Sequence, residues 1–206
     1  MNFLAHLQLA QPTPNSQFGA LLGDFCQGID LTLYPLAVQA AVQRHRLIDK
    51  FTDRHAHRRQ FIPRFSKQRR RFAPVALDVY DDHLLIRHWS HFYTTAAPEQ
   101  FQTTYQQLKQ LFSCDYPMPD AMEHTLRLLI SHDWFNQYSH QASIGKVLDR
   151  IASRIRFHNE FAGIIDELMQ LDDELEQSFL QFYPELQTYV TSLGDEVQQF
   201  QQSSLG

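Results

Sequence analysis

The sequence predicts an all-α fold. Apolar residues recur at the i, i+3, i+4, i+7 spacing of amphipathic helices in almost every segment of the 206 residues. No segment shows the sustained apolar and polar alternation that indicates a strand, and only 7 glycines are present, few for a fold rich in turns. With 43% hydrophobic and 13% aromatic residues, the chain can bury a full core. We expect one compact, multi-helix domain over residues 1–206, with a frayed tail at 197–206.

The first two helices are marked by small polar residues. Asn2 is placed to cap a short helix that ends before Pro12. Ser16 is placed to cap a second helix that runs to Gly28, a plausible glycine just past a helix end. This N-terminal segment has no basic stretch before its apolar residues, so we do not expect a signal peptide.

Prolines mark the next elements. Pro35 should open a long helix through about Phe51, because proline fits the first turn of a helix. Pro63 should end or bend any helix in the segment that follows. Pro74 then opens a helix that we expect to reach about Tyr93.

The second half continues in the same way. We expect a helix after Pro98 that ends near Phe112, another from Asp120, and a final amphipathic helix from Pro184. Two apolar stripes at helical spacing belong to the core; they comprise Ile144, Val147, Leu148, Ile151 and Ile155, and then Phe161, Ile164, Ile165, Leu168, Leu171, Leu175, Phe179 and Phe182.

The most informative stretch is the acidic run at 78–83. It places three carboxylates and the imidazole of His83 beside apolar residues, an arrangement that needs a cation or a solvent face. Asp78 and Asp82 are four residues apart and therefore share a helix face. His83 lies about 100° round the helix from Asp82, so the choice between these two as metal ligands stays open.

A second polar set lies upstream. His45 and Asp49 also stand at i and i+4, while His6 and Asp24 are isolated among apolar residues. Imidazole and carboxylate donors without thiolate favour Mn²⁺, Mg²⁺ or Fe over structural zinc. Solvated helix faces, a hydrogen-bonded core histidine at His6 and an outward-turned Asp24 are the alternatives to a metal site.

Charge is distributed unevenly along the chain. The net charge is −5, but residues 44–71 carry 11 Lys or Arg and two acids, whereas the chain from residue 157 onward carries ten acids and no Lys or Arg. The local net charge of +9 predicts a basic face that attracts an acidic partner. A nucleic acid is disfavoured, since no nucleic-acid-binding signature accompanies the basic segment.

Absent motifs narrow the chemistry. The two cysteines, Cys26 and Cys114, have no paired spacing, and a reducing cytoplasm fits them. Walker-type glycine loops, nucleophile elbows and His-Glu-x-x-His motifs are missing, and no apolar run is long enough for a membrane span. Metal-assisted hydrolysis is the leading chemistry.

Five ordered blocks carry a family resemblance: NFLAHLQLA, GALLGDFCQG, HRLIDKFTDRH, LDVYDDHLLIRHWS and FLQFYP. In this order, over about residues 2 to 186, the chain resembles the acyl carrier protein phosphodiesterases. The resemblance implies an all-helical, distorted member of the HD phosphohydrolase group. It also implies a Mn²⁺-dependent enzyme that releases 4′-phosphopantetheine from holo-acyl carrier protein, leaving apo-acyl carrier protein. Ordinary HD proteins place His and Asp next to each other, whereas here Arg46 follows His45 and the acid comes at Asp49.

The resemblance and the residues together give the expected site. The candidate metal ligands are His6, Asp24, His45, Asp49, Asp78, Asp82 and His83. Asp24, Arg46 and Asp49 are the candidate catalytic residues, with Arg46 stabilising transition-state charge. We expect the acidic carrier protein to dock on Arg54, Arg58, Arg59, Arg64, Lys67, Arg69, Arg70 and Arg71.

Two alternative functions stay open at this point. The same metal site would serve an HD-like phosphohydrolase of a nucleotide or another small phosphoester. A helical adaptor that binds an acidic partner, with structural His and Asp residues, would need no metal.

Overall fold

A computed structural model describes residues 1–204 and confirms the all-α prediction. The described residues form thirteen α-helices and three short 3-10 helices, and none of them lies in a strand. The helix starts predicted at Asn2, Pro35, Pro74, Pro98 and Asp120 are found within two residues of the expected position. The starts predicted from Ser16 and Pro184 differ, as described below.

The N-terminal helices differ in detail from the expectation. Helices α1 (Phe3–Leu9) and α2 (Pro14–Leu22) both form. Asn2 occupies the cap position of α1, but its side chain makes no capping hydrogen bond. Thr13, not Ser16, caps α2, because its hydroxyl accepts the Ser16 N–H at 3.2 Å. The second helix therefore ends earlier than predicted, at Leu22, although Gly28 does adopt a positive φ of 78° in the loop beyond it.

Helix α3 (Leu36–Arg54) and the segment after it agree better with the sequence. The basic segment forms α4 (Ala56–Phe61) and two single turns, η2 (Ile62–Arg64) and η3 (Arg70–Phe72). Helix α4 thus ends two residues before Pro63, in agreement with the prediction that this proline ends a helix. The acidic run lies on α5 (Ala73–Arg87). The helix predicted to reach Tyr93 is interrupted at His88, and the remainder is α6 (Trp89–Phe92).

The C-terminal half holds one wrong prediction about a helix start. Pro184 lies inside a helix and does not begin one, because α12 runs without a break across it. A proline inside a helix costs about 3 kcal/mol. Burial of Phe179, Phe182, Tyr183 and Leu186 on that helix offsets this cost. The helices of this half are α7 (Ala97–Leu111), α8 (Asp120–Ser131), α9 (Trp134–Gln137), α10 (Gln141–Arg154), α11 (Ile165–Gln170), α12 (Asp172–Ser192) and α13 (Glu196–Ser204).

The tail that we expect to fray is helical up to Ser204, and residues 205 and 206 lie outside the described part. Helix α13 packs against α3, and Glu196 is buried where its carboxylate accepts the Ser16 hydroxyl at 2.8 Å. Tertiary contacts of this kind hold a helix that its own glutamine-rich sequence would not.

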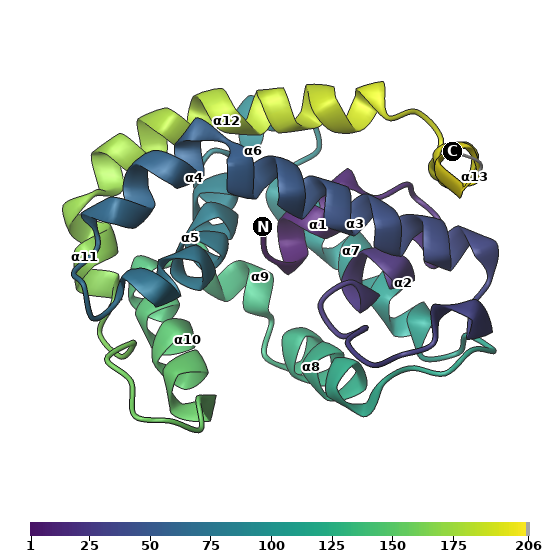
Figure 1. The fold of residues 1–206 in the computed structure, drawn as a ribbon, viewed down its shortest axis with the longest axis horizontal. Coiled ribbons are helices and arrows are strands. Elements are labelled where there is room, and N and C mark those ends of the chain that lie inside the picture. The colour runs from purple at the N-terminus through teal and green to yellow at the C-terminus, as the bar shows by residue number, and fades with distance from the viewer. Residues whose placement is uncertain (205–206) are drawn as a thin grey trace.

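Helix α3 organises the arrangement of the others. It packs against α2 and α13, while α1 contacts both α2 and α5. Figure 1 shows the N-terminus near the middle of the molecule, α12 lying along α3 and α4, and α8 to α10 below them. Most buried apolar side chains belong to one continuous cluster. No helix in the described residues has the length and apolar character needed to cross a bilayer.

Candidate metal centre and adjoining cavity

Three side chains from α1 and α3 converge on one point. His6 Nε2 lies 3.1 Å from Asp49 Oδ1, and His45 Nε2 lies 3.0 Å from Asp49 Oδ2. One donor atom from each of the three residues lies within 4.8 Å of the donor atoms of the other two. The two imidazole rings stack at a centroid distance of 3.9 Å. Two imidazoles and one carboxylate in this spacing form a donor set for a single divalent cation.

Close packing of α2 against α3 fixes the position of His45. A Cβ added at Gly19 would lie 2.5 Å from Ala41 Cβ, and one added at Gly23 would lie 2.3 Å from the His45 ring. Only glycine fits at either position without displacing α3 or the imidazole. The end of α2 is therefore a cradle for the imidazole, and the GALLGD segment has a structural reason for both of its glycines.

Both histidines direct Nε2 at the carboxylate of Asp49, where a metal ion would bind. His45 Nδ1 donates to the carbonyl of Ala20 at 2.7 Å, and because a carbonyl only accepts, the Nε2 atom carries the lone pair in the neutral imidazole. His6 Nε2 faces Asp49, and His6 Nδ1 is buried without a partner among the described residues. This orientation fits a metal site, in which a ligand histidine presents one neutral nitrogen.

The electrostatics of the cluster also fit a cation. Burial lowers the pKa of His6 to about 4, so this imidazole is neutral at pH 7. Burial opposes ionisation of Asp49, but hydrogen bonds from His45 and His6 outweigh it and hold the pKa of the carboxyl well below its usual range. For His45 burial opposes the proton, but Asp49 and Asp24 outweigh burial and raise the pKa. The cluster thus attracts positive charge, which a divalent cation would supply.

Asp24 lies beside this cluster. Its Oδ1 atom is 3.7 Å from His45 Nε2, and its side chain is 39% exposed in the loop after α2. The surrounding protein removes water from the Asp24 carboxyl, and this desolvation raises its pKa to about 6. This carboxylate therefore stands between the histidines and the solvent.

Asp78 is close to the cluster but is engaged by other cations. Its Oδ1 atom accepts from the Met1 ammonium group at 2.6 Å and from Arg58 Nη2. The same ammonium group lies 3.6 Å from Asp49 Oδ1. Asp78 thus borders the donor set through this ion-pair chain, and no direct contact joins it to either histidine within the described residues.

The structure separates Asp82 and His83, two of the predicted ligands, from the donor set of His6, His45 and Asp49. Asp82 is fully buried and accepts the backbone N–H groups of Leu4 and Ala5 at 3.0 and 3.1 Å, so it caps the N-terminus of α1 from another helix. His83 Nδ1 instead donates to the carbonyl of Tyr138 at 2.6 Å. The reason is the helical register: Asp78 faces the cluster, while Asp82 sits one turn further along, under the start of α1.

The residues predicted to bind an acidic partner fall into two groups. Arg58 is buried with 1% exposure and pairs with Asp78 and Asp81, so its prediction as a docking residue is wrong. Four others are exposed or half-exposed but already engaged: Arg64 by Glu174, Arg69 by Glu167 and backbone carbonyls, Arg70 by the carbonyls of Pro63 and Phe65, and Arg71 by the rings of Phe72 and Phe157.

Within residues 1–204, Arg54, Arg59 and Lys67 are exposed and their side chains make no ion pair or hydrogen bond. A count of charges along the sequence could not show which basic side chains are paired, because the acids that pair with them come from the C-terminal quarter and meet them only in the folded protein. Arg46 is also exposed, and its Nη2 atom lies 3.4 Å from Cys26 Sγ. It does not line the cavity described next.

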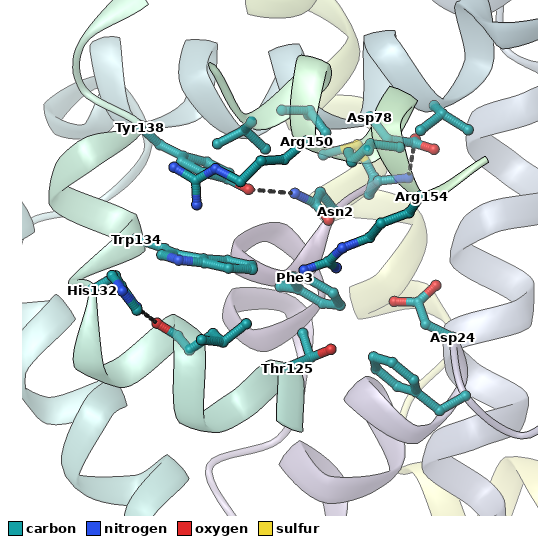
Figure 2. Close-up of a pocket in the computed structure, with 17 residues that line it drawn as sticks. Asn2, Phe3, Asp24, Asp78, Thr125, His132, Trp134, Tyr138, Arg150 and Arg154 are labelled. Carbon is teal, nitrogen blue, oxygen red and sulfur yellow. Dashed lines mark hydrogen bonds and ion pairs between the residues drawn. The ribbon is translucent and has the colours of Figure 1, made fainter. Parts of the chain in front are cut away.

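A cavity of about 520 Å³ adjoins the cluster, and Asp24 and Asp78 line it together with Met1. Figure 2 shows Asp24 at one side of this space and the side chains of Arg150 and Arg154 reaching into it from α10. The remaining wall is mostly apolar and is formed in part by Phe3, Leu128, Trp134, Val147 and Ile151. A mostly apolar cleft with a few convergent polar groups is typical of a ligand site.

Sequence reasoning did not single out Arg150 and Arg154. Their i, i+4 spacing within the apolar stripe from Ile144 to Ile155 placed them on one helix face, but none of the candidate metal ligands lies near them in the sequence. Only the packing of α10 against α5 brings them to the cavity.

Comparisons with known proteins give one consistent family. The model of the acyl carrier protein phosphodiesterase family matches residues 1–186. A protein named acyl carrier protein phosphodiesterase from Serratia proteamaculans is 34% identical over 186 residues, covering 90% of this chain and 95% of the relative. One of the same name from Escherichia coli is 36% identical over 192 residues, with the same coverage of each chain. No solved structure matches.

Proposed function

Because this chain belongs to the acyl carrier protein phosphodiesterase family, we propose that it hydrolyses the phosphodiester joining 4′-phosphopantetheine to a serine of holo-acyl carrier protein. The observation that carries the proposal is the convergence of His6, His45 and Asp49 beside a cavity open to a ligand. The products are apo-acyl carrier protein and 4′-phosphopantetheine. The described geometry agrees with a phosphoester hydrolase, and the family supplies the substrate.

The proposed cofactor is a divalent metal ion, with Mn²⁺ as the first choice. His6 Nε2, His45 Nε2 and Asp49 would hold it, and Asp24 would complete the set on the cavity side. These donors are nitrogen and oxygen only, which suits Mn²⁺. When bound, such an ion lowers the pKa of a water molecule and offsets negative charge on phosphoryl oxygens. We propose that this centre is a distorted HD-like site, in which Asp49 follows His45 by four residues.

The chain's own residues do the remaining work. Ala20 orients His45 through its carbonyl, and Gly23 leaves room for the ring. Arg58 pairs with Asp78 and so fixes this carboxylate at the wall of the cavity. We leave Arg46 out of the catalytic set, because it reaches Cys26 and does not line the cavity.

We propose that acyl carrier protein, an acidic protein, docks on the exposed cations that keep their charge free. These are Arg54, Arg59 and Lys67. Arg54 is five residues after Asp49 on α3, about 7.5 Å along the helix axis, so a partner bound there is close to the metal centre. The free thiols of Cys26 and Cys114 support a cytoplasmic location for this reaction.

One experiment tests the function directly. Protein stripped of metal and resupplied with Mn²⁺ is incubated with holo-acyl carrier protein, and the carrier is weighed by mass spectrometry. We expect loss of the phosphopantetheine group, with no loss in the metal-free sample or with Asp49→Asn. Parallel samples with nucleotide monophosphates and cyclic dinucleotides report on other phosphoesters. A carrier protein that keeps its group under Mn²⁺, Mg²⁺ and Fe²⁺ contradicts the proposal.

A further inference from the structure

Two unpartnered arginines stand at the cavity next to the proposed metal centre. Arg150 and Arg154 are exposed on α10 and line the cavity. Among the described residues, neither side chain has an ion pair or a hydrogen bond. Most other arginines of the molecule are paired with an acid or a carbonyl, as Arg64, Arg69 and Arg87 are. Two free guanidinium groups that line the same open cavity therefore suggest a site for an anion.

Their spacing makes the arrangement costly for the helix alone. Arg150 and Arg154 are four residues apart, and Lys146 lies four residues before Arg150 on the same helix. Like charges at this spacing destabilise an isolated helix by about 0.2 to 0.5 kcal/mol per pair. An anion between them would reverse this repulsion and accept charge-assisted hydrogen bonds.

The cavity carries opposite charges on its two sides. Asp24 and Asp78 line the side that adjoins the metal centre, and the two arginines come from α10. In the view of Figure 2, Arg154 reaches toward Phe3 and the side of Asp24, whereas Arg150 reaches toward Tyr138. The same cavity is also lined by apolar side chains, including Ile151 and Trp134. The space thus suits a ligand with an anionic head and a long, weakly polar body.

We propose that Arg154 binds the phosphate group of the 4′-phosphopantetheine arm and that Arg150 donates to the carbonyl and hydroxyl oxygens of the same arm. This inference rests on the proposed function and extends it, since it assigns the arm to the cavity and its phosphate to a named residue. Guanidinium groups suit phosphate oxygens because they donate two parallel hydrogen bonds. A volume of about 520 Å³ lies within the range of sites for ligands of this size.

The test is a binding measurement that does not depend on turnover. Titration calorimetry on metal-free protein compares 4′-phosphopantetheine with pantetheine, which lacks the phosphate. We expect wild-type protein to prefer the phosphorylated compound by about tenfold, as one charge-assisted contact predicts. Arg154→Met should abolish this preference and leave pantetheine binding intact, while Arg154→Lys keeps part of it. Arg150→Met should weaken both compounds to a similar degree.

Arg156→Met is the matched control, because Arg156 is exposed just after α10 and does not line the cavity. It should bind both compounds as the wild type does. Circular dichroism melts confirm that each variant is folded, which the exposure of these side chains favours. A phosphate preference that survives in Arg154→Met, or its absence in the wild type, overturns the inference.

The kinetics separate this inference from the proposed function. In the Mn²⁺-loaded enzyme, Arg154→Met should raise KM for holo-acyl carrier protein and lower kcat. If wild-type protein releases no phosphopantetheine but binds it in an Arg154-dependent way, the proposed function fails and the phosphate site stands. If the enzyme is active and Arg154→Met binds and turns over like the wild type, the phosphate site fails alone.

Discussion

The imidazole rings of His6 and His45 stack at a centroid distance of 3.9 Å, and both direct Nε2 at the carboxylate of Asp49. The two histidines come from α1 and α3, which are joined through α2. The contact brings three metal-ligand side chains from two helices to one point, so loss of any of them should weaken metal binding.

Asp49→Asn should lower Mn²⁺ affinity by more than the roughly 10- to 100-fold that loss of a supporting group causes, because it removes a proposed ligand. Metal content after dialysis and the electron paramagnetic resonance of free Mn²⁺ measure this. Asp53→Asn, at an exposed position one turn later on α3, is the control and should bind Mn²⁺ normally. Equal Mn²⁺ affinity in both variants would contradict the proposed donor set.

Gly23→Ala should reduce activity by roughly 100-fold through displacement of the His45 ring, since a shift of about 1 Å at a reactive group has this effect. A Cβ at this position would lie 2.3 Å from the ring. Turnover of holo-acyl carrier protein and Mn²⁺ affinity are measured side by side. Gly145→Ala serves as the control, because its Cβ would meet only the Ile165 side chain, at 3.3 Å. An active Gly23→Ala enzyme would show that the cradle is not needed.

Arg59→Glu should raise KM for acyl carrier protein several-fold with little change in kcat, because a docking charge acts on encounter with the partner. KM of the wild type should rise with salt, and the variant should depend on salt less. Lys109→Glu makes the same charge change at an exposed position on α7 and is the control. If both variants have the same KM, the docking surface lies elsewhere.

Asp82→Ala should lower the free energy of unfolding by about 1 to 3 kcal/mol, the usual effect of leaving buried N–H groups without an acceptor. The two groups belong to Leu4 and Ala5 at the start of α1. Urea unfolding monitored by circular dichroism measures the loss. Asp82→Asn keeps one acceptor oxygen and should lose less. A full loss of Mn²⁺ binding in folded Asp82→Asn would return Asp82 to the ligand set.

Asp81 should contribute to acid sensitivity. Burial opposes its ionisation, but His57 and Arg58 outweigh burial and hold the pKa of Asp81 below its ordinary value. Between the folded and the unfolded pKa of Asp81, the unfolded chain binds more protons than the folded protein. The stability that Asp81 contributes is therefore present above pH of about 4 and is lost as the pH falls through the folded pKa.

Asp81→Asn should therefore be less stable than the wild type at pH 7, by about 3 kcal/mol, the low end for breaking a buried ion pair. Its stability should fall less steeply below pH of about 4. Urea unfolding from pH 7 to pH 2.5 measures both effects, with the exposed Asp115→Asn as the control. An unchanged acid slope in Asp81→Asn would show that other carboxylates cause the acid sensitivity.

The sequence alone determined the local features of this protein. Proline and the helical apolar period located most helices, because both act within one turn of the chain. The pair His45 and Asp49 converges for the same reason, since residues four apart on a helix face each other. The ordered blocks also identified the family, which the match over residues 1–186 confirms.

Tertiary structure decided what depends on residues far apart in the sequence. Asp82 caps a helix because the start of α1 packs above it, and Pro184 lies within α12 because core burial offsets its cost. The basic segment loses much of its free charge because acids from α11 and α12 pair with it, as Glu167 and Glu174 do. Arg150 and Arg154 reach the cavity only through packing of α10 on α5. Local patterns carry no information on which helix faces meet, because that choice rests on burial summed over the whole core.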